Sequence, residues 1–318
     1  MTWMPFLCLA IGFFIGMRNL TARMLKKIDG IINIALVVLM LTIGINIGIN
    51  DSVMSNLDSI GLNCLAISLS AIAFSVLFTV IIEKTVLPLD KLKEKLSLEN
   101  ININSEIDIS KEEKSENSRL IWIMPVSIVI GVILGYFLTS YIQTFLLDYM
   151  LIGSLIILYV SVGISLSSNK KVFKYIRILG FRVIYISIAV IAGSLVGGFV
   201  AGTLLGIPLH ISVISASGMS YYSLTGAYMT QVYGIQAGTY GFVVNVMREF
   251  FTVLLLPFLI KISMGSPIAS GAAGNMDTML VPVTKVVGAE LGLVTLITGV
   301  ILTFVVPFIL PVLYSLFS

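Results

Sequence analysis

Stretches of about 20 mostly apolar residues recur along almost the whole chain, and they limit its fold more than any other feature. Met1–Met17, Gly238–Ile262 and Val287–Leu316 are examples. A helix of this length crosses the hydrocarbon core of a bilayer and satisfies its own backbone hydrogen bonds there. Hydrophobic residues make up 58% of the chain and charged residues 11%, against about 25% charged in soluble domains. Because no alternating β-barrel pattern accompanies these stretches, the sequence predicts an all-α polytopic membrane protein.

The charges between the apolar stretches predict which side of the membrane each loop faces. Lys and Arg concentrate in cytoplasmic loops, so Arg18–Lys27 and Lys170–Arg177 are expected inside. Asn50–Asp58 and Ser140–Asp148 contain neither residue type and are expected outside. The hydrophilic segment 83–119 is expected to be a charged, solvated cytoplasmic linker. These loops fit six spans, with the N-terminus outside.

The chain repeats itself weakly at an offset of 119 positions, which superposes Gly12 on Gly131 and Gly16 on Gly135. Other matches are Trp3 with Trp122, Gly44 with Gly163, Asn50 with Asn169, Gly61 with Gly180, Ser68 with Ser187 and Ser75 with Ser194. Each copy holds three spans, an odd number, so the copy in 120–205 is expected to lie inverted relative to that in 1–82. Inverted repeats favour a carrier, because they provide two related conformations that face opposite sides of the membrane.

Residues 206–318 are expected to form a further region, in which the pattern of simple spans breaks. His210–Gly234 is long enough to cross but is dense in Ser, Thr, Tyr and Gly. If it crossed, Lys261 and Lys285 would face outside, against the charge rule. We therefore expect this segment and Pro267–Lys285 to form two re-entrant or broken hairpins that enter from opposite sides and meet near the midplane. With one long span after each hairpin, the chain would have about eight transmembrane helices and both termini outside.

Two carboxylates lie where an apolar protein should have none. Glu249 is inside an apolar span, and Asp277 is in the second expected hairpin. A carboxylate at membrane depth costs roughly 2.5 kcal/mol or more, so such residues mark functional sites. Asn245 precedes Glu249 by one helical turn and shares its face, whereas Arg248 is turned away by about 100°. These four residues are therefore candidates for binding substrate or protons.

Polar residues of the two expected hairpins complete the candidate set: Ser217, Ser220, Tyr221, Ser223 and Asn275. Structural alternatives remain for these candidates. Arg248 could form a buried ion pair with either carboxylate that only fixes helix packing. A serine hydroxyl could bond a carbonyl of its own helix, and Tyr221 could be an aromatic residue of the membrane interface.

Three segments carry a family resemblance: SASGMSYYSLTGAYM, NVMREFFTVLLLPFLI and SGAAGNMDTMLVPV. Together they resemble the lysine exporter LysO family, over most of residues 120–318 and more weakly over the first three spans. The resemblance implies eight spans with both termini outside, and export of lysine or close analogues in exchange for protons. It places the essential acidic pair of that family on Glu249 and Asp277. The charged loop 83–119 departs from the family pattern.

The chemistry of lysine suits these residues. Its extra ammonium group favours carboxylate partners, and its own carboxylate favours amide or helix N-terminal donors. If a proton and the cationic substrate compete for one carboxylate, their fluxes are coupled. The expected partners are thus a cationic amino acid, protons and the lipid bilayer, and a homodimer is one option for assembly.

Other functions are compatible with the same pattern. A sodium- or proton-coupled carrier of another amino acid or small solute could use the same hairpins. An intramembrane hydrolase is a weaker alternative, because Ser217 has no paired histidine and His210 is expected at the outer mouth. Cys8 and Cys64 lie in apolar spans, so neither a disulfide framework nor a metal site of Cys and His spacing is expected. No cofactor is expected. No basic, aromatic-interleaved patch suggests a nucleic acid partner.

Overall fold

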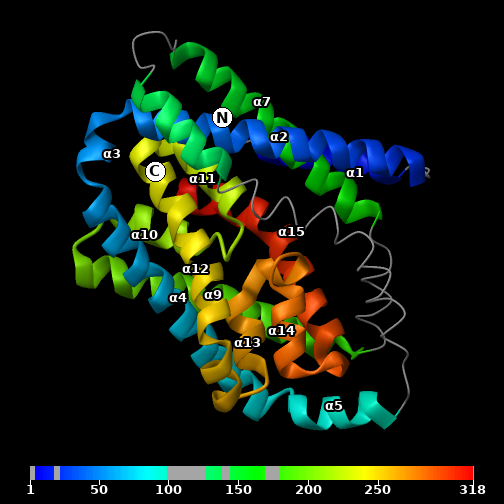
Figure 1. The fold of residues 1–318 in the computed structure, drawn as a ribbon. Coiled ribbons are helices and arrows are strands. Elements are labelled where there is room, and N and C mark those ends of the chain that lie inside the picture. Colours follow the sequence, from blue (N-terminus) through cyan, green and yellow to red (C-terminus); the bar gives the residue numbers. More distant parts are fainter. Residues whose placement is uncertain (1–3, 18–21, 99–125, 138–143, 169–178, 318) are drawn as a thin grey trace.

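The computed structural model describes residues 4–17, 22–98, 126–137, 144–168 and 179–317, and all regular elements in these ranges are helical (Figure 1). The first two thirds contain α1 (Met4–Met17), α2 (Ala22–Ile49), α3 (Asp51–Ser55), α4 (Leu57–Thr85), α5 (Leu89–Leu98), a helix at Val126–Phe137, α7 (Thr144–Ser168), the 3-10 helix η2 (Phe181–Val183) and α9 (Ile184–Leu205). The last third contains α10 (Leu209–Ala216), α11 (Tyr222–Tyr233), α12 (Ile235–Ile262), α13 (Gly265–Gly271), η3 (Ala272–Met276), α14 (Leu280–Val287), η4 (Ala289–Leu291) and α15 (Gly292–Phe317).

Six helices among the described residues are long and apolar enough to cross a bilayer. They belong to α2, α4, α7, α9, α12 and α15. Large apolar side chains such as Phe199, Phe250 and Phe258 are exposed on them, as a lipid-facing surface requires. The chain is therefore a multi-pass, all-helical membrane protein, as predicted. The other two expected spans correspond to the shorter apolar helices α1 and Val126–Phe137, so the count of eight stays a prediction.

Glycine pairs bring the first helix of each three-helix group against the second helix of the other group. Gly12 on α1 packs against Gly163 on α7, and Gly44 on α2 packs against Gly131. A Cβ on Gly163 would lie 3.0 Å from the Cα of Gly12, and a Cβ on Gly131 would lie 3.0 Å from the Cα of Gly44. Only small residues allow two helices to approach so closely. The offset of 119 positions equates Gly12 with Gly131 and Gly44 with Gly163, so the two pairs are equivalent contacts.

The third helices of the two groups, α4 and α9, also pack closely. A Cβ on Gly197 would lie only 2.6 Å from the Cα of Ala71. Nearby, the hydroxyls of Ser75 and Ser194 lie 3.2 Å apart. The same offset equates these two serines, so this contact joins a position to its own counterpart.

The beginning of the segment 83–119 is folded, which differs from the solvated linker that its charges suggest. Glu83 is still within α4, is buried, and accepts a hydrogen bond of 3.0 Å from the backbone N–H of Gly265. In α5, Leu89 is fully buried, and Lys93 donates a hydrogen bond of 2.8 Å to the last carbonyl of α14. Charged residues elsewhere on α5 account for its hydrophilic composition. The remainder of the segment lies outside the described residues.

The first expected hairpin is formed by α10 and α11. The rings of His210 and Tyr233, near its start and at its end, lie 4.8 Å apart between centroids, so both ends of the hairpin are on the same side of the molecule. Gly206 and Gly234 have φ values of 66° and 87°, which glycine adopts without strain. They turn the chain into α10 and then into the long helix α12.

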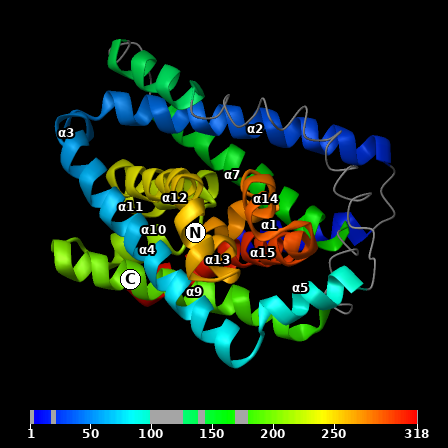
Figure 2. The same cartoon turned by 60° about the horizontal axis from the view of Figure 1, so that its bottom comes forward.

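The second hairpin, α13 and α14, lies at the opposite end of the molecule. Its start bonds Glu83 near the end of α4, and its last carbonyl bonds Lys93 on α5. α4 and α12 begin at the same end, where Asn63 donates to the hydroxyl of Tyr240 at 3.0 Å. The first hairpin therefore opens beside the start of α12 and the second beside its end. Figures 1 and 2 both place α12 between α2 and α4, both of which it contacts.

Candidate functional site

The two hairpins meet through their backbones at the points where their helices are interrupted. Ala273 in η3 donates a hydrogen bond of 2.9 Å to the carbonyl of Met219. Met219, Ser220 and Ala272 have φ values of 49°, 76° and 49°, which non-glycine residues rarely adopt. Strained backbone persists only where its surroundings hold it, and it clusters at functional sites. We call this place the crossing point.

Asn245 holds the first hairpin in its interrupted form. Its side chain is fully buried on α12, and its Oδ1 accepts the backbone N–H of Ser220 at 2.8 Å. Its Nδ2 donates to the carbonyls of Ser215 at 2.9 Å and of Gly241 at 2.7 Å. Because a helix break leaves backbone groups without intrahelical partners, these bonds stabilise the break. Asn245 thus uses both ends of its amide on the protein backbone.

Arg248 lies among neutral oxygens. Its Nε donates to the carbonyl of Ser270 at 3.2 Å, and its Nη2 donates to that of Ala269 at 3.1 Å. It also donates to the hydroxyl of Ser194 at 2.8 Å and to that of Ser75 at 3.1 Å. The side chain is only 1% exposed. These four bonds differ from the buried ion pair that was the structural alternative for this residue.

Glu249 and Asp277 are brought to one place by α12 and the second hairpin. Thr278 donates a hydrogen bond of 3.0 Å to Oε1 of Glu249, and a Cβ on Gly274 would lie 3.0 Å from the same oxygen. Asp277 directly follows η3, and its carboxyl group is within electrostatic range of Glu249. Glu249 is half-buried and Asp277 is exposed. The acidic pair therefore lies at an open edge of the crossing point.

Two tyrosines at the start of α11 are close to this pair. Tyr222 is within electrostatic range of both carboxyl groups, and Tyr221 is within range of Asp277. The ring of Tyr222 also packs edge-on against Phe242, with centroids 5.6 Å apart. Tyr221 was a predicted candidate, and the structure places it beside the acidic pair together with its neighbour.

Two predicted candidates keep one buried polar atom unpaired. Ser220 Oγ and Asn275 Oδ1 have no hydrogen-bond partner among the residues that the structure describes. The amide nitrogen of Asn275 donates to the carbonyl of Ile268 at 2.7 Å, which fixes the side chain. Buried polar atoms are nearly always bonded in proteins, so an unpaired one in a hairpin tip is suited to a ligand.

The last two candidates differ from the others. Ser217 is 1% exposed and donates to the carbonyl of Ile214 in its own helix at 2.8 Å, as the structural alternative proposed. Ser223 is buried in α11. Thr278 was missed by the sequence analysis, although it directly follows Asp277. A hydroxyl adjacent to an intramembrane carboxylate was the available signal.

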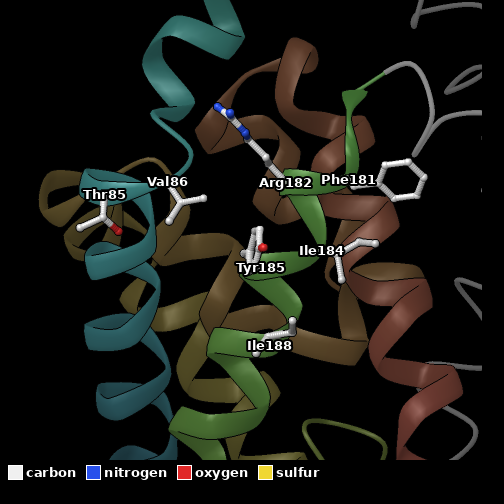
Figure 3. A pocket seen from close by; sticks show the side chains of 7 residues that line it. All are labelled: Thr85, Val86, Phe181, Arg182, Ile184, Tyr185 and Ile188. Atoms are coloured by element: carbon white, nitrogen blue, oxygen red, sulfur yellow. The ribbon is translucent and has the colours of Figure 1, made fainter.

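A cavity of about 560 Å³ lies elsewhere, between the end of α4 and the start of α9 (Figure 3). It is lined by Thr85, Val86, Phe181, Arg182, Ile184, Tyr185 and Ile188, none of which is a predicted site residue. Within the described ranges, no three His, Cys, Asp or Glu side chains are grouped to hold a metal ion. The candidate site is therefore defined by the contacts at the crossing point.

A bundle of long apolar helices around two interrupted hairpins, with polar groups where the hairpins meet, is an architecture of multi-pass membrane transporters. The profile of the lysine exporter LysO family matches residues 6–98 and 125–314. The chain therefore belongs to the lysine exporter LysO family, as the three sequence segments suggested.

Two relatives support this assignment. The lysine exporter LysO of Escherichia coli (strain K12) is 27% identical over 304 residues, which cover 95% of each chain. A putative lysine exporter of Haemophilus influenzae is 24% identical over 184 residues, which cover 58% of this chain and 93% of that protein. No solved structure matches the chain.

Proposed function

We propose that this protein exports L-lysine and close cationic analogues across the cell membrane in exchange for protons, with Glu249 and Asp277 as the shared site for cation and proton. The observation that carries the proposal is the placement of these two carboxylates. A long helix and an interrupted hairpin bring them together beside the crossing point. The names of both relatives, as exporters of lysine, agree with this function.

The side chains around the pair match the groups of lysine. Its two ammonium groups suit the carboxylates of Glu249 and Asp277. The hydroxyl of Ser220 can donate to the substrate carboxylate, and Oδ1 of Asn275 can accept from an ammonium. A carboxylate at membrane depth must face water or a partner rather than lipid, so the exposed side of Asp277 marks the route of entry.

Competition between the two cargoes couples their fluxes. A protonated carboxyl group has no charge with which to hold an ammonium, whereas an ionised one holds it strongly. A proton that binds from outside is therefore released when lysine arrives from inside. The hydroxyl of Thr278 keeps Glu249 oriented toward the second hairpin through this exchange.

Inverted repeats would open this site to the two sides in turn. We infer that residues 1–82 and 120–205 are such repeats, supported by the contacts Gly12–Gly163 and Gly44–Gly131, which the offset interconverts. If α1 and Val126–Phe137 are counted as spans, the chain has eight transmembrane helices. The loop charges then place both termini outside the cytoplasm.

Efflux from preloaded cells that express the protein tests the function. Lysine and ornithine are expected to leave faster than in cells without the protein, and leucine is not. E249Q and D277N should each slow lysine efflux at least about tenfold, which corresponds to a loss of about 1.4 kcal/mol. S217A is the matched control, because within the described residues this hydroxyl donates to a carbonyl of its own helix.

Two results would contradict this proposal. Wild-type lysine efflux in E249Q and D277N would remove the acidic pair from the site. Efflux of leucine or another solute instead of lysine, driven by a sodium or proton gradient, would favour the alternative of a coupled carrier for that solute.

A further inference from the structure

Arg248 lies where the two proposed repeats meet. Its guanidinium donates to Ser75 on α4 at 3.1 Å and to Ser194 on α9 at 2.8 Å. These serines are equated by the offset of 119 positions, and their hydroxyls lie 3.2 Å apart. A contact between a residue and its own counterpart lies on the two-fold axis that relates the copies. One side chain from outside both copies therefore bonds to both of them at their axis.

The other hydrogen bonds of Arg248 reach the second hairpin. They go to the carbonyls of Ala269 and Ser270, at the end of α13. The last carbonyls of a helix lack intrahelical partners, and a cation there is also favoured by the helix dipole. One turn along α12, the hydroxyl of Thr252 lies 2.7 Å from that of Ser270. α12 thus holds the end of α13 immediately before the loop that carries Asp277.

The guanidinium has little capacity left for a solute. An arginine presents five N–H donors in a rigid planar fork. Four hydrogen bonds of Arg248 already go to protein oxygens, and the side chain is 1% exposed. A carboxylate that bound this fork through two parallel bonds would have to displace several of them. The geometry therefore points away from the substrate-binding role that the sequence suggested for this residue.

We propose that Arg248 is a positioning residue, which fixes α12 and the second hairpin to the axis of the two repeats and does not bind the substrate carboxylate. This inference rests on the proposed export function. When inverted repeats exchange conformations, residues on their axis move least. Arg248 keeps its partners through this exchange, while the acidic pair opens first to one side and then to the other. It positions Glu249 through α12 and Asp277 through the hairpin.

The test compares R248K, S75A and S194A with wild-type protein in lysine-loaded vesicles. The lysine side chain placed at position 248 keeps the positive charge, but its single ammonium group cannot reach two hydroxyls and two carbonyls at once. R248K should lower the maximal rate of lysine exchange about tenfold or more and leave KM within about twofold, as loss of positioning predicts. S75A and S194A should each lower the rate by similar, smaller factors. S68A is the control, because Ser68 is a buried serine on α4 whose hydroxyl donates to the carbonyl of Leu65 in the same helix.

Cadaverine, which is lysine without its α-carboxylate, separates positioning from binding. If Arg248 only positions, R248K keeps the wild-type preference for lysine over cadaverine in competition. If Arg248 bound the carboxylate, R248K would raise the KM for lysine, and cadaverine would compete about as well as lysine. That result would overturn the proposal, and so would a wild-type rate in the variant S75A/S194A.

A wild-type protein that exchanges no lysine would contradict the proposed function, and a stability measurement then tests Arg248 by itself. In thermal unfolding of the purified protein, the losses in melting temperature from S75A and R248K should be less than additive, because both remove the same bond. Strictly additive losses would contradict the inferred role of Arg248 whatever the substrate is.

Discussion

At the level of single residues, Thr278 is a neutral side chain that orients a carboxylate through one hydrogen bond. Its hydroxyl donates to Oε1 of Glu249 at 3.0 Å. Such a bond orients the carboxylate. Asn245 and Arg248 have a different role, because their hydrogen bonds go to the backbone and to serines. The polar residues near the crossing point thus divide into those that face the acidic pair and those that hold the hairpins.

T278V should weaken transport by removing this donor while keeping the size of the side chain. We expect a loss of about three- to tenfold in lysine efflux, the effect of one typical hydrogen bond. T278S keeps the hydroxyl and should restore most of the rate. T284V is the matched control, because Thr284 is in the same hairpin and its hydroxyl has no partner in the described residues. Equal rates for T278V and T284V would contradict the assigned role of Thr278.

The sequence predicts some of these residue roles and not others. The helical period places Arg248 off the face of Glu249, and the structure confirms that the two side chains have different partners. Its partners could not be predicted, because they come from three other helices and lie up to 173 positions away along the chain. The match of Ser75 with Ser194 was visible in the sequence, but nothing local indicates that the two hydroxyls touch.

Between elements, glycines determine how closely the helices approach. A Cβ on Gly131 would lie 2.6 Å from the carbonyl oxygen of Leu41, so the two helices would have to separate. The offset shows which glycines are equivalent, but it does not show that the first helix of each group packs against the second helix of the other. The Ser- and Gly-rich composition predicts the interrupted hairpins. Composition does not predict that α5 is folded against the protein, because its buried Leu89 is surrounded in the sequence by charged residues.

G131A should destabilise the protein, because the added methyl group has no space in this helix contact. Overpacking costs about 1–3 kcal/mol, which should lower the melting temperature of the purified protein. G153A is the control, since a Cβ on Gly153 would meet nothing within 4 Å and alanine favours helix. A G131A protein as stable as G153A would contradict the close contact between α2 and residues 126–137.

Across the whole molecule, the two hairpins open at opposite ends of α12 and meet in its middle part. This arrangement places the acidic pair between the two ends of α12. The apolar stretches are sufficient to predict the six long apolar helices and their order along the chain. They are not sufficient to predict how near Glu249 and Asp277 lie, because that depends on the path of the second hairpin after Gly274.

Proton movement driven by lysine is the most direct measurement of the central claim. Vesicles that contain the purified protein and a trapped pH indicator are given a lysine gradient, and the proton flux is followed. Wild-type protein should move protons against the direction of lysine, and E249Q and D277N should lose this coupling. Lysine-driven proton flux that is unchanged in both variants would show that the acidic pair is not the shared site.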